Sequence, residues 1–157
     1  MNRTPLLISA CLLGEACRYD GKSKPLPANV LTALRREYRL IPICPERDGG
    51  LPTPRPPCER RGDAVVTRDG TDCTEAYAAG ARIALQAAEE NRCGLALLKE
   101  RSPSCGAGEI HDGGFAGGLI RGNGVTAALL AEHGIRVYGE SRVGCLVHPS
   151  EKSDPES

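Results

Sequence analysis

The chain has few aromatic residues and no net charge. The first limits what its core can contain, and the second argues against some classes of binding surface. Only 3% of its 157 residues are aromatic, with no Trp, so a core must be built from Leu, Ile, Val and Ala. The 20 basic side chains balance the 20 acidic ones, which argues against a nucleic-acid or membrane surface. No apolar run approaches the length of a membrane span. The length fits one domain over residues 1–149, and the polar residues 150–157 predict a disordered tail.

No C-x-x-C motif is present among the eight cysteines, which argues against common structural zinc sites and thioredoxin-like redox chemistry. The N-terminal apolar stretch is short and favours a buried strand over a signal peptide, so we expect a cytoplasmic protein. A reducing cytosol does not favour a disulfide framework. Any one cysteine could simply be a small buried hydrophobic residue, so position must identify those with a chemical role.

Apolar runs alternate with helical patterns along the chain. Four runs are typical of buried strands: Leu6–Ala10, Arg39–Ile43, Gly94–Leu98 and Ile135–Tyr138. Helical spacing predicts three helices, over residues 29–38, 72–91 and 123–133, with starts at Asp72 and Asn123. This alternation predicts an α/β fold: a single layered domain with a mainly parallel, roughly four-stranded sheet and crossover helices.

Two segments between these elements are rich in Pro or Gly. In Ile41–Pro57, the prolines after the apolar run predict a stiff, non-helical backbone. Gly106–Gly124 predicts a loop with special turns or a lid. Asp63–Thr67 is predicted to be a short strand or an extended arm, and Gly80 is expected to allow a close approach of its helix to the sheet.

Three cysteines follow predicted strands. Cys11 and Cys44 come directly after a strand, and Cys105 lies a few residues beyond the third. Because the carboxyl ends of parallel strands meet at one edge of a sheet, we expect these thiols to lie at the same edge. Three thiolates there suit a soft metal or an iron–sulfur cluster. Cys17 and Cys58 lie in loops at this edge and remain possible ligands.

The remaining cysteines are placed elsewhere by the same pattern. Cys93 precedes a strand and should lie at the opposite end of the sheet, Cys73 stands at a helix start, and Cys145 lies near the C-terminus. The three histidines are too scattered to suggest a zinc site.

Three stretches in order resemble the 2-thiouracil desulfurase family: SACLLGEACRYDG (Ser9–Gly21), ICPERDGGLPTPRPP (Ile43–Pro57) and LLKERSPSCG (Leu97–Gly106). HDGGFAGGLIRGNGVTAALL (His111–Leu130) fits the same pattern, except that His111 stands where a Tyr is expected. The resemblance runs from about Ile8 to Val137. It implies a [4Fe-4S] cluster held by Cys11, Cys44 and Cys105, with a fourth iron free of protein ligands. It also implies removal of sulfur from a thiolated pyrimidine.

Nearby polar side chains are candidates for the remaining chemistry. An iron with an open position can act as a Lewis acid toward a thiocarbonyl sulfur, and a water that attacks the ring carbon needs a base. The sequence alone leaves Glu46 equally open as this base or as a loop carboxylate paired with an arginine, and the resemblance favours the base. Ser102 and Ser104 could hydrogen-bond substrate or cluster sulfur, or could satisfy a turn. Five charged residues are open between substrate binding and a solvated loop: Arg18, Asp20, Lys99, Glu100 and Arg101.

The predicted function is non-redox desulfuration of a thiouracil or thiouridine type of compound to the oxo form, with release of sulfide. One alternative is an iron–sulfur or other metal-binding sensor module. Another is a metal-free transferase in which Cys44 or Cys105 is the nucleophile. The neutral charge favours a small thiopyrimidine over nucleic acid, and a cluster implies contact with the cluster-assembly machinery. The choices between base, nucleotide and tRNA and between 2-thio and 4-thio substrates stay open.

Overall fold

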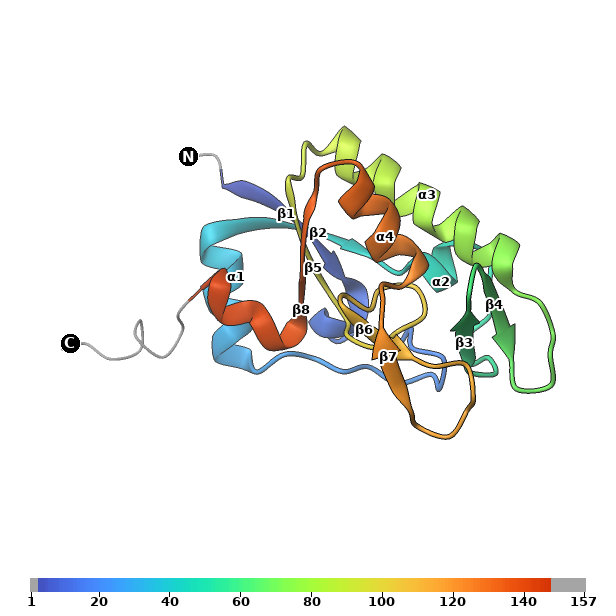
Figure 1. Ribbon diagram of the computed structural model, residues 1–157. Coiled ribbons are helices and arrows are strands. Elements are labelled where there is room, and N and C mark those ends of the chain that lie inside the picture. The colour runs from blue at the N-terminus through green and yellow to red at the C-terminus, as the bar shows by residue number, and fades with distance from the viewer. Residues whose placement is uncertain (1–2, 148–157) are drawn as a thin grey trace.

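A parallel sheet of four strands forms the centre of the computed structural model, which describes residues 3–147 (Figure 1). The strands are β1 (Thr4–Ser9), β2 (Tyr38–Ile43), β5 (Leu95–Leu98) and β8 (Arg136–Gly139), in the order β2-β1-β5-β8. All three neighbouring pairs are parallel. The α/β fold and its four-stranded parallel sheet are therefore confirmed, whereas the predicted tail lies outside the described residues.

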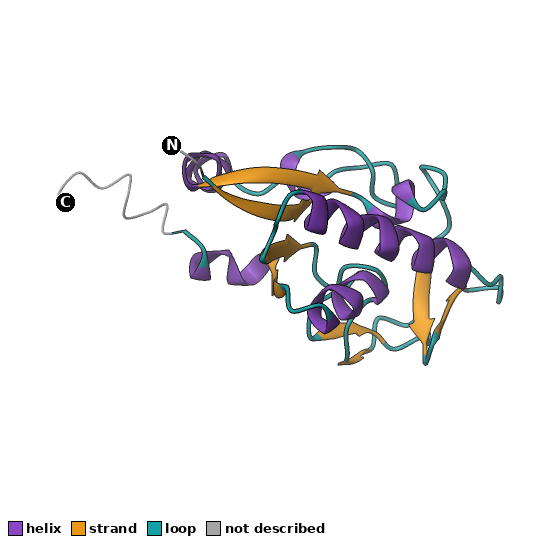
Figure 2. Ribbon diagram, turned by 90° about the horizontal axis from the view of Figure 1, so that it is seen from above, coloured by secondary structure: helices purple, strands orange, loops and turns teal. Residues whose placement is uncertain are grey.

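Helices cover both faces of this sheet. Helix α1 (Ala28–Glu37) packs on the face that carries Leu6, Ile8 and Leu97. Helices α3 (Thr74–Glu90) and α4 (Val125–Glu132) lie side by side over the face that carries Leu7 and Leu98 (Figures 1 and 2). Alternate residues of β1 and β5 thus enter two different apolar clusters, as the two-residue period of a strand requires.

Small side chains let α3 and α4 pack closely, since most of the buried residues of α3 are Ala or Gly. The buried face of α3 consists of Tyr77, Gly80, Ala81, Ala84 and Ala88. Both predicted helix starts differ by a residue or two from the observed ones. The N-cap of α3 is Cys73, although Asp72 still accepts a hydrogen bond from the backbone of Thr74. The N-cap of α4 is Gly124, because the Asn123 side chain instead accepts a hydrogen bond from the backbone N–H of Gly108.

The segment after β2 differs from its prediction. A short helix, α2 (Pro45–Asp48), begins directly after Cys44, where a non-helical backbone was expected. Pro45 occupies the first helical position, at which the missing N–H costs no hydrogen bond and the fixed φ angle favours the helix. Asp48 then turns back and accepts a hydrogen bond from the backbone of Cys44 at 3.1 Å. The helix carries Glu46, which lines the cavity at this edge of the sheet.

Glycines allow α2 to lie directly on α3. A Cβ atom on Gly80 would lie 1.9 Å from the carbonyl oxygen of Pro45, and one on Gly49 would lie 2.3 Å from that of Ala76. The expectation that Gly80 approaches the sheet is thus wrong, since its close neighbour is α2. The contact fixes α2, and with it Glu46, against the longest helix of the fold.

Two antiparallel hairpins extend beyond the sheet. The first pairs β3 (Cys58–Arg61) with β4 (Ala64–Thr67), so the strand predicted near 63–67 is confirmed. The second pairs β6 (Glu109–His111) with β7 (Leu119–Arg121), inside the glycine-rich stretch that was predicted as a loop. Residues 112–118, between β6 and β7, form a loop as predicted. Both hairpins lie at the carboxyl end of the sheet in Figure 1.

The strand order creates a crevice at that end. From β1 the chain passes to β2 on one side and later to β5 on the other, so the order reverses between β1 and β5. The loops after these strands diverge at such a switch point, which is where open α/β sheets bind ligands. Two 3₁₀ segments complete the fold, Ala10–Leu13 after β1 and Glu140–Cys145 after β8. No helix within residues 3–147 is long and apolar enough to cross a membrane.

Candidate active site at the carboxyl edge of the sheet

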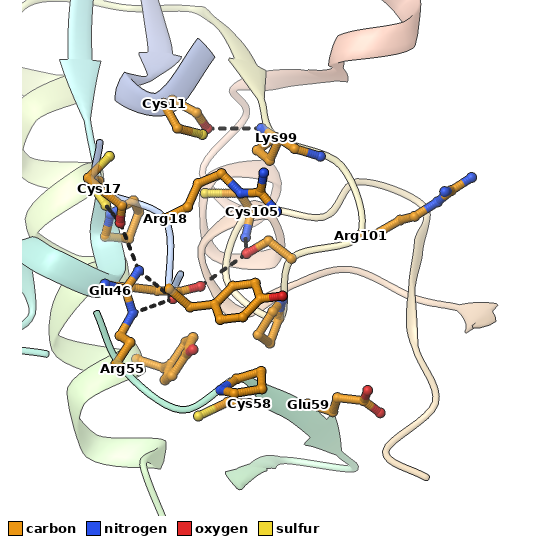
Figure 3. A pocket seen from close by; sticks show the side chains of 18 of the residues that line it. Cys11, Cys17, Arg18, Glu46, Arg55, Cys58, Glu59, Lys99, Arg101 and Cys105 are labelled. Atoms are coloured by element: carbon orange, nitrogen blue, oxygen red, sulfur yellow. Dashed lines mark hydrogen bonds and ion pairs between the residues drawn. The ribbon is translucent and has the colours of Figure 1, made fainter. Parts of the chain in front are cut away.

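A cavity of about 370 Å³ opens at the switch point. The loops after β1, β2 and β5 form its inner wall, and β3, β6 and the 112–118 loop contribute the outer wall. Five buried cysteines line it: Cys11, Cys17, Cys44, Cys58 and Cys105. Figure 3 labels all of them except Cys44. The sheet therefore gathers cysteines from four separate segments of the chain into one site.

The three predicted cluster ligands are among these five. Cys11 and Cys44 directly follow β1 and β2, as the sequence predicts, and Cys105 ends the loop after β5. Two of the cysteines predicted to lie elsewhere do so. Cys93 packs in the apolar cluster under α3 and α4, and Cys145 is exposed. Strand order thus separates the cysteines of the site from those of the core and surface.

Cys17 and Cys44 form a close pair. The sulfur of Cys44 lies 3.7 Å from the carbonyl oxygen of Cys17. A hydrogen bond from the Cys17 thiol lowers the pKa of Cys44 to about 7, and the Arg47 backbone and the charges of Arg47 and Arg55 act in the same direction. The same hydrogen bond, together with burial, raises the pKa of Cys17. Cys44 is therefore the thiol of this pair that ionises at neutral pH.

Cys11 and Cys105 are held as neutral thiols when no metal is bound. Burial, and then the neighbouring Cys44, raises the pKa of Cys11 to about 11. Burial also raises the pKa of Cys105, and it outweighs the opposing hydrogen bond with Ser9. Because thiolates are the metal-binding form, loading this site must release protons.

The donor set suits an iron–sulfur cluster better than a single ion. Within residues 3–147, no three His, Cys, Asp or Glu side chains converge on one point as the ligands of a single metal ion would. The thiols instead surround a cavity of appreciable volume. Cysteine thiolates around such a space are the ligands that hold iron–sulfur clusters in proteins. Cys11, Cys44 and Cys105 could therefore hold a cluster.

Glu46 lies in this cavity and is also paired with an arginine. Oε1 of Glu46 lies 2.9 Å from a guanidinium nitrogen of Arg55, and the two side chains are 13% and 3% exposed. Its other oxygen, Oε2, accepts a hydrogen bond from the hydroxyl of Ser102 at 3.2 Å. The arginine pairing that the sequence left open is thus present, and it leaves the carboxylate at the cavity wall.

Sequence reasoning missed Arg55, although it examined the proline-rich loop that carries it. Besides Glu46, its guanidinium donates to the carbonyl oxygens of Cys17 (2.9 Å) and Pro52 (3.0 Å) and to the hydroxyl of Thr53 (3.0 Å). Arg55 therefore joins the loop after β1 to α2. The signal in the sequence was an arginine between two prolines, Pro54 and Pro56, in a rigid stretch that also carries Glu46.

The two predicted serines have different surroundings. Ser102 lines the cavity, and its hydroxyl accepts hydrogen bonds from the backbones of Ser104 and Cys105 at 3.0 Å each. It thus satisfies the turn and also reaches Glu46. Ser104 is buried, and its hydroxyl bonds that of Thr126 at 2.7 Å in the α4 interface. Ser104 is not among the residues that line the cavity, so its geometry supports packing of the turn rather than contact with a substrate.

The charged loop residues divide between the cavity and the solvent. Lys99 lines the cavity and pairs with Glu140 at 3.1 Å. Arg18 also lines it and approaches Asp20 at 3.8 Å. Glu100 lines the cavity but bonds the backbone of Ser141. Arg101 also lines the cavity, but its side chain is largely exposed and extends away from the other labelled side chains in Figure 3.

The 112–118 loop covers the outer side of the cavity. The buried carboxylate of Glu59 accepts hydrogen bonds from the backbones of Gly113 (2.9 Å) and Phe115 (3.1 Å). The ring of Phe115 contacts the guanidinium groups of Arg61 and Arg68, 5.6 and 5.3 Å from the ring centre. Phe115 also lines the cavity, so the only phenylalanine of the chain is held against the site.

A further thiol pair borders the cavity next to α3. The sulfurs of Cys58 and Cys73 lie 3.7 Å apart. Burial, and then the hydrogen bond with Cys73, raises the pKa of Cys58 to about 12. Tyr77 lines the cavity beside them, and burial, with the nearby charge of Glu46, raises the pKa of its hydroxyl. The Cys58 thiol and the Tyr77 hydroxyl are therefore neutral at physiological pH.

Comparison with known proteins agrees with this geometry. The family model of 2-thiouracil desulfurase matches residues 6–142. An uncharacterized protein of Bacillus subtilis strain 168, YbbK, is 40% identical over 152 residues, which cover 90% of this chain and 99% of the relative. A solved structure of a [4Fe-4S]-dependent thiouracil desulfidase, TudS, is 49% identical with a TM-score of 0.88, over 92% of this chain and 95% of that one. The chain therefore belongs to the 2-thiouracil desulfurase family.

Proposed function

We propose that this protein removes sulfur from a thiolated pyrimidine by hydrolysis, with a [4Fe-4S] cluster held by Cys11, Cys44 and Cys105. The observation that carries the proposal is that these thiols line the same cavity as the Glu46–Ser102 pair. A solved relative at 49% identity is a [4Fe-4S]-dependent thiouracil desulfidase, which supports both the cofactor and the substrate class.

The cluster and the carboxylate have separate tasks. Cys11, Cys44 and Cys105 would hold the cluster, which would supply a Lewis acid for the soft thiocarbonyl sulfur. Glu46 accepts the proton of the water that attacks the ring carbon. Ser102 holds Oε2 of this carboxylate, and Arg55 holds Oε1. The carbon–sulfur bond is replaced by a carbon–oxygen bond, sulfide leaves at its original oxidation state, and no electron donor is consumed.

The cavity favours a small substrate. Its volume of about 370 Å³ lies in the usual range for small-molecule sites. Tyr19, Pro103 and Phe115 give it apolar surface on which a flat ring can pack. The balanced charge of the chain favours a small molecule over tRNA, so a free thiopyrimidine base or its nucleotide is the expected substrate. Cluster-assembly machinery of the cytoplasm would supply the cofactor.

Anaerobic reconstitution with iron and sulfide, followed by a 2-thiouracil assay, tests this function. We expect a brown protein with four irons per chain that converts 2-thiouracil to uracil without a reductant. Replacing Cys11, Cys44 or Cys105 with Ala should abolish stable cluster binding, whereas Cys93→Ala and Cys145→Ala should retain it. Loss of iron in Cys58→Ala with retention in Cys105→Ala would show that the ligand set is wrong. A loaded protein that never turns over thiopyrimidines would instead indicate a sensor module.

One observation favours a second function. The pKa of Cys44 is lowered to about 7, which is the property of a nucleophilic thiol. A metal-free transferase would use this thiolate directly. Such a protein would be colourless and fully active after chelation of iron, so colour and chelation distinguish the two functions.

A further inference from the structure

His111, the last residue of β6, lines the cavity and has no part in the chemistry described above. Within residues 3–147, its Nδ1 is the one buried side-chain nitrogen or oxygen without a hydrogen-bond partner. Nε2 also lacks a partner among the described residues, but it is not buried. A buried polar atom without a partner calls for an explanation in a native fold. The imidazole that carries this atom stands at a ligand site.

The burial of Nδ1 decides which nitrogen carries the proton. A proton on Nδ1 would bury an N–H donor that has no acceptor, which costs the desolvation of that donor. A buried lone pair is tolerated more readily than a buried donor. The neutral imidazole of His111 therefore carries its proton on Nε2, the accessible nitrogen.

Other polar groups in this part of the wall are already engaged. Glu59, on the neighbouring strand β3, accepts hydrogen bonds from Gly113 and Phe115. Glu46 is bonded by Arg55 and Ser102. The guanidinium of Arg68 donates to the carbonyl oxygen of Phe115. Each of these groups has hydrogen-bond partners within the protein, whereas the Nε2–H of His111 is a donor that has no acceptor among the described residues.

We propose that His111 is a specificity-determining residue whose Nε2–H donates a hydrogen bond to a ring carbonyl oxygen of the thiopyrimidine substrate. The inference rests on the proposed function. Thiouracils carry a carbonyl oxygen as well as the thiocarbonyl sulfur, and their product uracil carries two. A tyrosine, which the family pattern predicts at this position, would also present a donor, so the role survives the change of residue.

Two substitutions and two substrates isolate the hydrogen bond. His111→Gln keeps an N–H donor at about the reach of Nε2, whereas His111→Leu removes it. 2-Thiouracil has the ring carbonyl, and pyrimidine-2-thione lacks it. With cluster-loaded enzyme, we expect the KM for 2-thiouracil to rise about tenfold in His111→Leu and less than about threefold in His111→Gln, the worth of one hydrogen bond. The kcat should stay within about twofold, since this hydrogen bond stabilises the bound substrate and the transition state equally. The KM for pyrimidine-2-thione should not differ between the two variants.

Equilibrium dialysis of uracil gives a readout independent of turnover. Its Kd for the loaded protein should weaken about tenfold in His111→Leu and change little in His111→Gln. His111→Phe serves as a second donor-free variant if His111→Leu loses iron or melts early. An equal KM in all forms, a loss confined to kcat, or an equal loss for both substrates would overturn the assignment. Failure of the unmodified protein to desulfurise 2-thiouracil would refute the proposed function instead, and the uracil Kd values would still test His111.

Discussion

Arg55 and Glu46 form an ion pair across the cavity wall, 2.9 Å apart and with side-chain exposures of only 3% and 13%. The same guanidinium also holds the carbonyl oxygen of Cys17 in the loop after β1. Arg55 is thus a positioning residue: it sets the direction of the proposed base and links it to the segment that carries the cluster thiols. A lysine has one point of charge and cannot reproduce this fork of hydrogen bonds.

Arg55→Lys should therefore lower kcat by roughly 10–100-fold while KM and iron content change little. A misplaced base gives only part of the rate enhancement of roughly 10²–10⁴-fold that a positioned base supplies. Arg55→Met should behave differently. It leaves a largely buried carboxylate unpaired, which typically costs about 3–5 kcal/mol of folding stability. Steady-state kinetics, iron analysis and urea unfolding separate the two effects. A normal kcat in Arg55→Lys would remove the positioning role.

Gly80 offers a test of how α2 is placed. In Gly80→Ala, the new Cβ would lie 1.9 Å from the carbonyl oxygen of Pro45, a backbone atom that cannot rotate away. We expect α2 to shift and the free energy of unfolding to fall by about 2–3 kcal/mol, with a lower kcat because Glu46 moves. Gly94→Ala is the matched control, since nothing lies within 4 Å of its Cβ position. Equal stability and activity of the two variants would show that the α2–α3 contact is not rigid.

Much of the fold and part of the site follow from local patterns. The four strands were predictable because each is a short apolar run, and their parallel order then placed Cys11, Cys44 and Cys105 at one edge. This inference needs only the approximate end of each strand, so an error of one or two residues in a strand boundary does not change it.

The remaining features depend on contacts between distant segments. Helix α2 was missed because four residues carry too little periodicity, and proline is ambiguous between a loop and a helix start. The sequence left Ser104 open between a contact with the substrate and a turn, because its partner Thr126 lies 22 residues away on α4. Arg55 gained its role from bonds to Glu46 and Cys17, 9 and 38 residues away. No local pattern specifies such partners.

The buried thiol of Cys58 predicts the stability of the cluster-free protein at alkaline pH. In the fold, the pKa of Cys58 is raised from 9.0 to about 12, chiefly by burial. Below pH 9 the thiol is protonated in both states, and its contribution to stability is fully present. Above pH 9 the unfolded chain loses this proton while the folded chain keeps it, so stability falls until the pH approaches 12. The loss is at most about 1.4 kcal/mol per pH unit for each such thiol.

Cys58→Ala should make this alkaline decline shallower. Between pH 8 and pH 10.5, we expect the drop in the free energy of unfolding to shrink by about 1 kcal/mol, a value discounted for partial solvent screening. Urea unfolding at a series of pH values measures it. Cys145→Ala, which removes an exposed thiol, should leave the slope unchanged. An identical slope in both variants would contradict the burial of the Cys58 thiol.

Glu46 and the source of oxygen provide the most direct test of the hydrolytic reaction. Glu46→Gln keeps the size of the side chain, and its amide oxygen can still accept from Arg55 while its NH2 group faces the Ser102 hydroxyl, but it cannot take up a proton at neutral pH. We expect normal iron content, a KM near that of the unmodified enzyme, and a kcat lower by roughly 10²–10⁴-fold. Ser102→Ala is the companion variant. It keeps the carboxylate and removes one hydrogen bond to Oε2, so its loss in kcat should be smaller, about tenfold.

The same enzyme in ¹⁸O-labelled water shows where the new oxygen comes from. Uracil formed from 2-thiouracil should carry one labelled oxygen, at the carbon that lost sulfur, because a water proton goes to Glu46 and the oxygen goes to the ring. Sulfide should appear in equal amount with no electron donor added, since it leaves at the oxidation state it had in the substrate. A strict need for a reductant in each turnover would refute hydrolysis. Full activity of Glu46→Gln would instead keep hydrolysis and transfer the role of base to another group at the cavity wall.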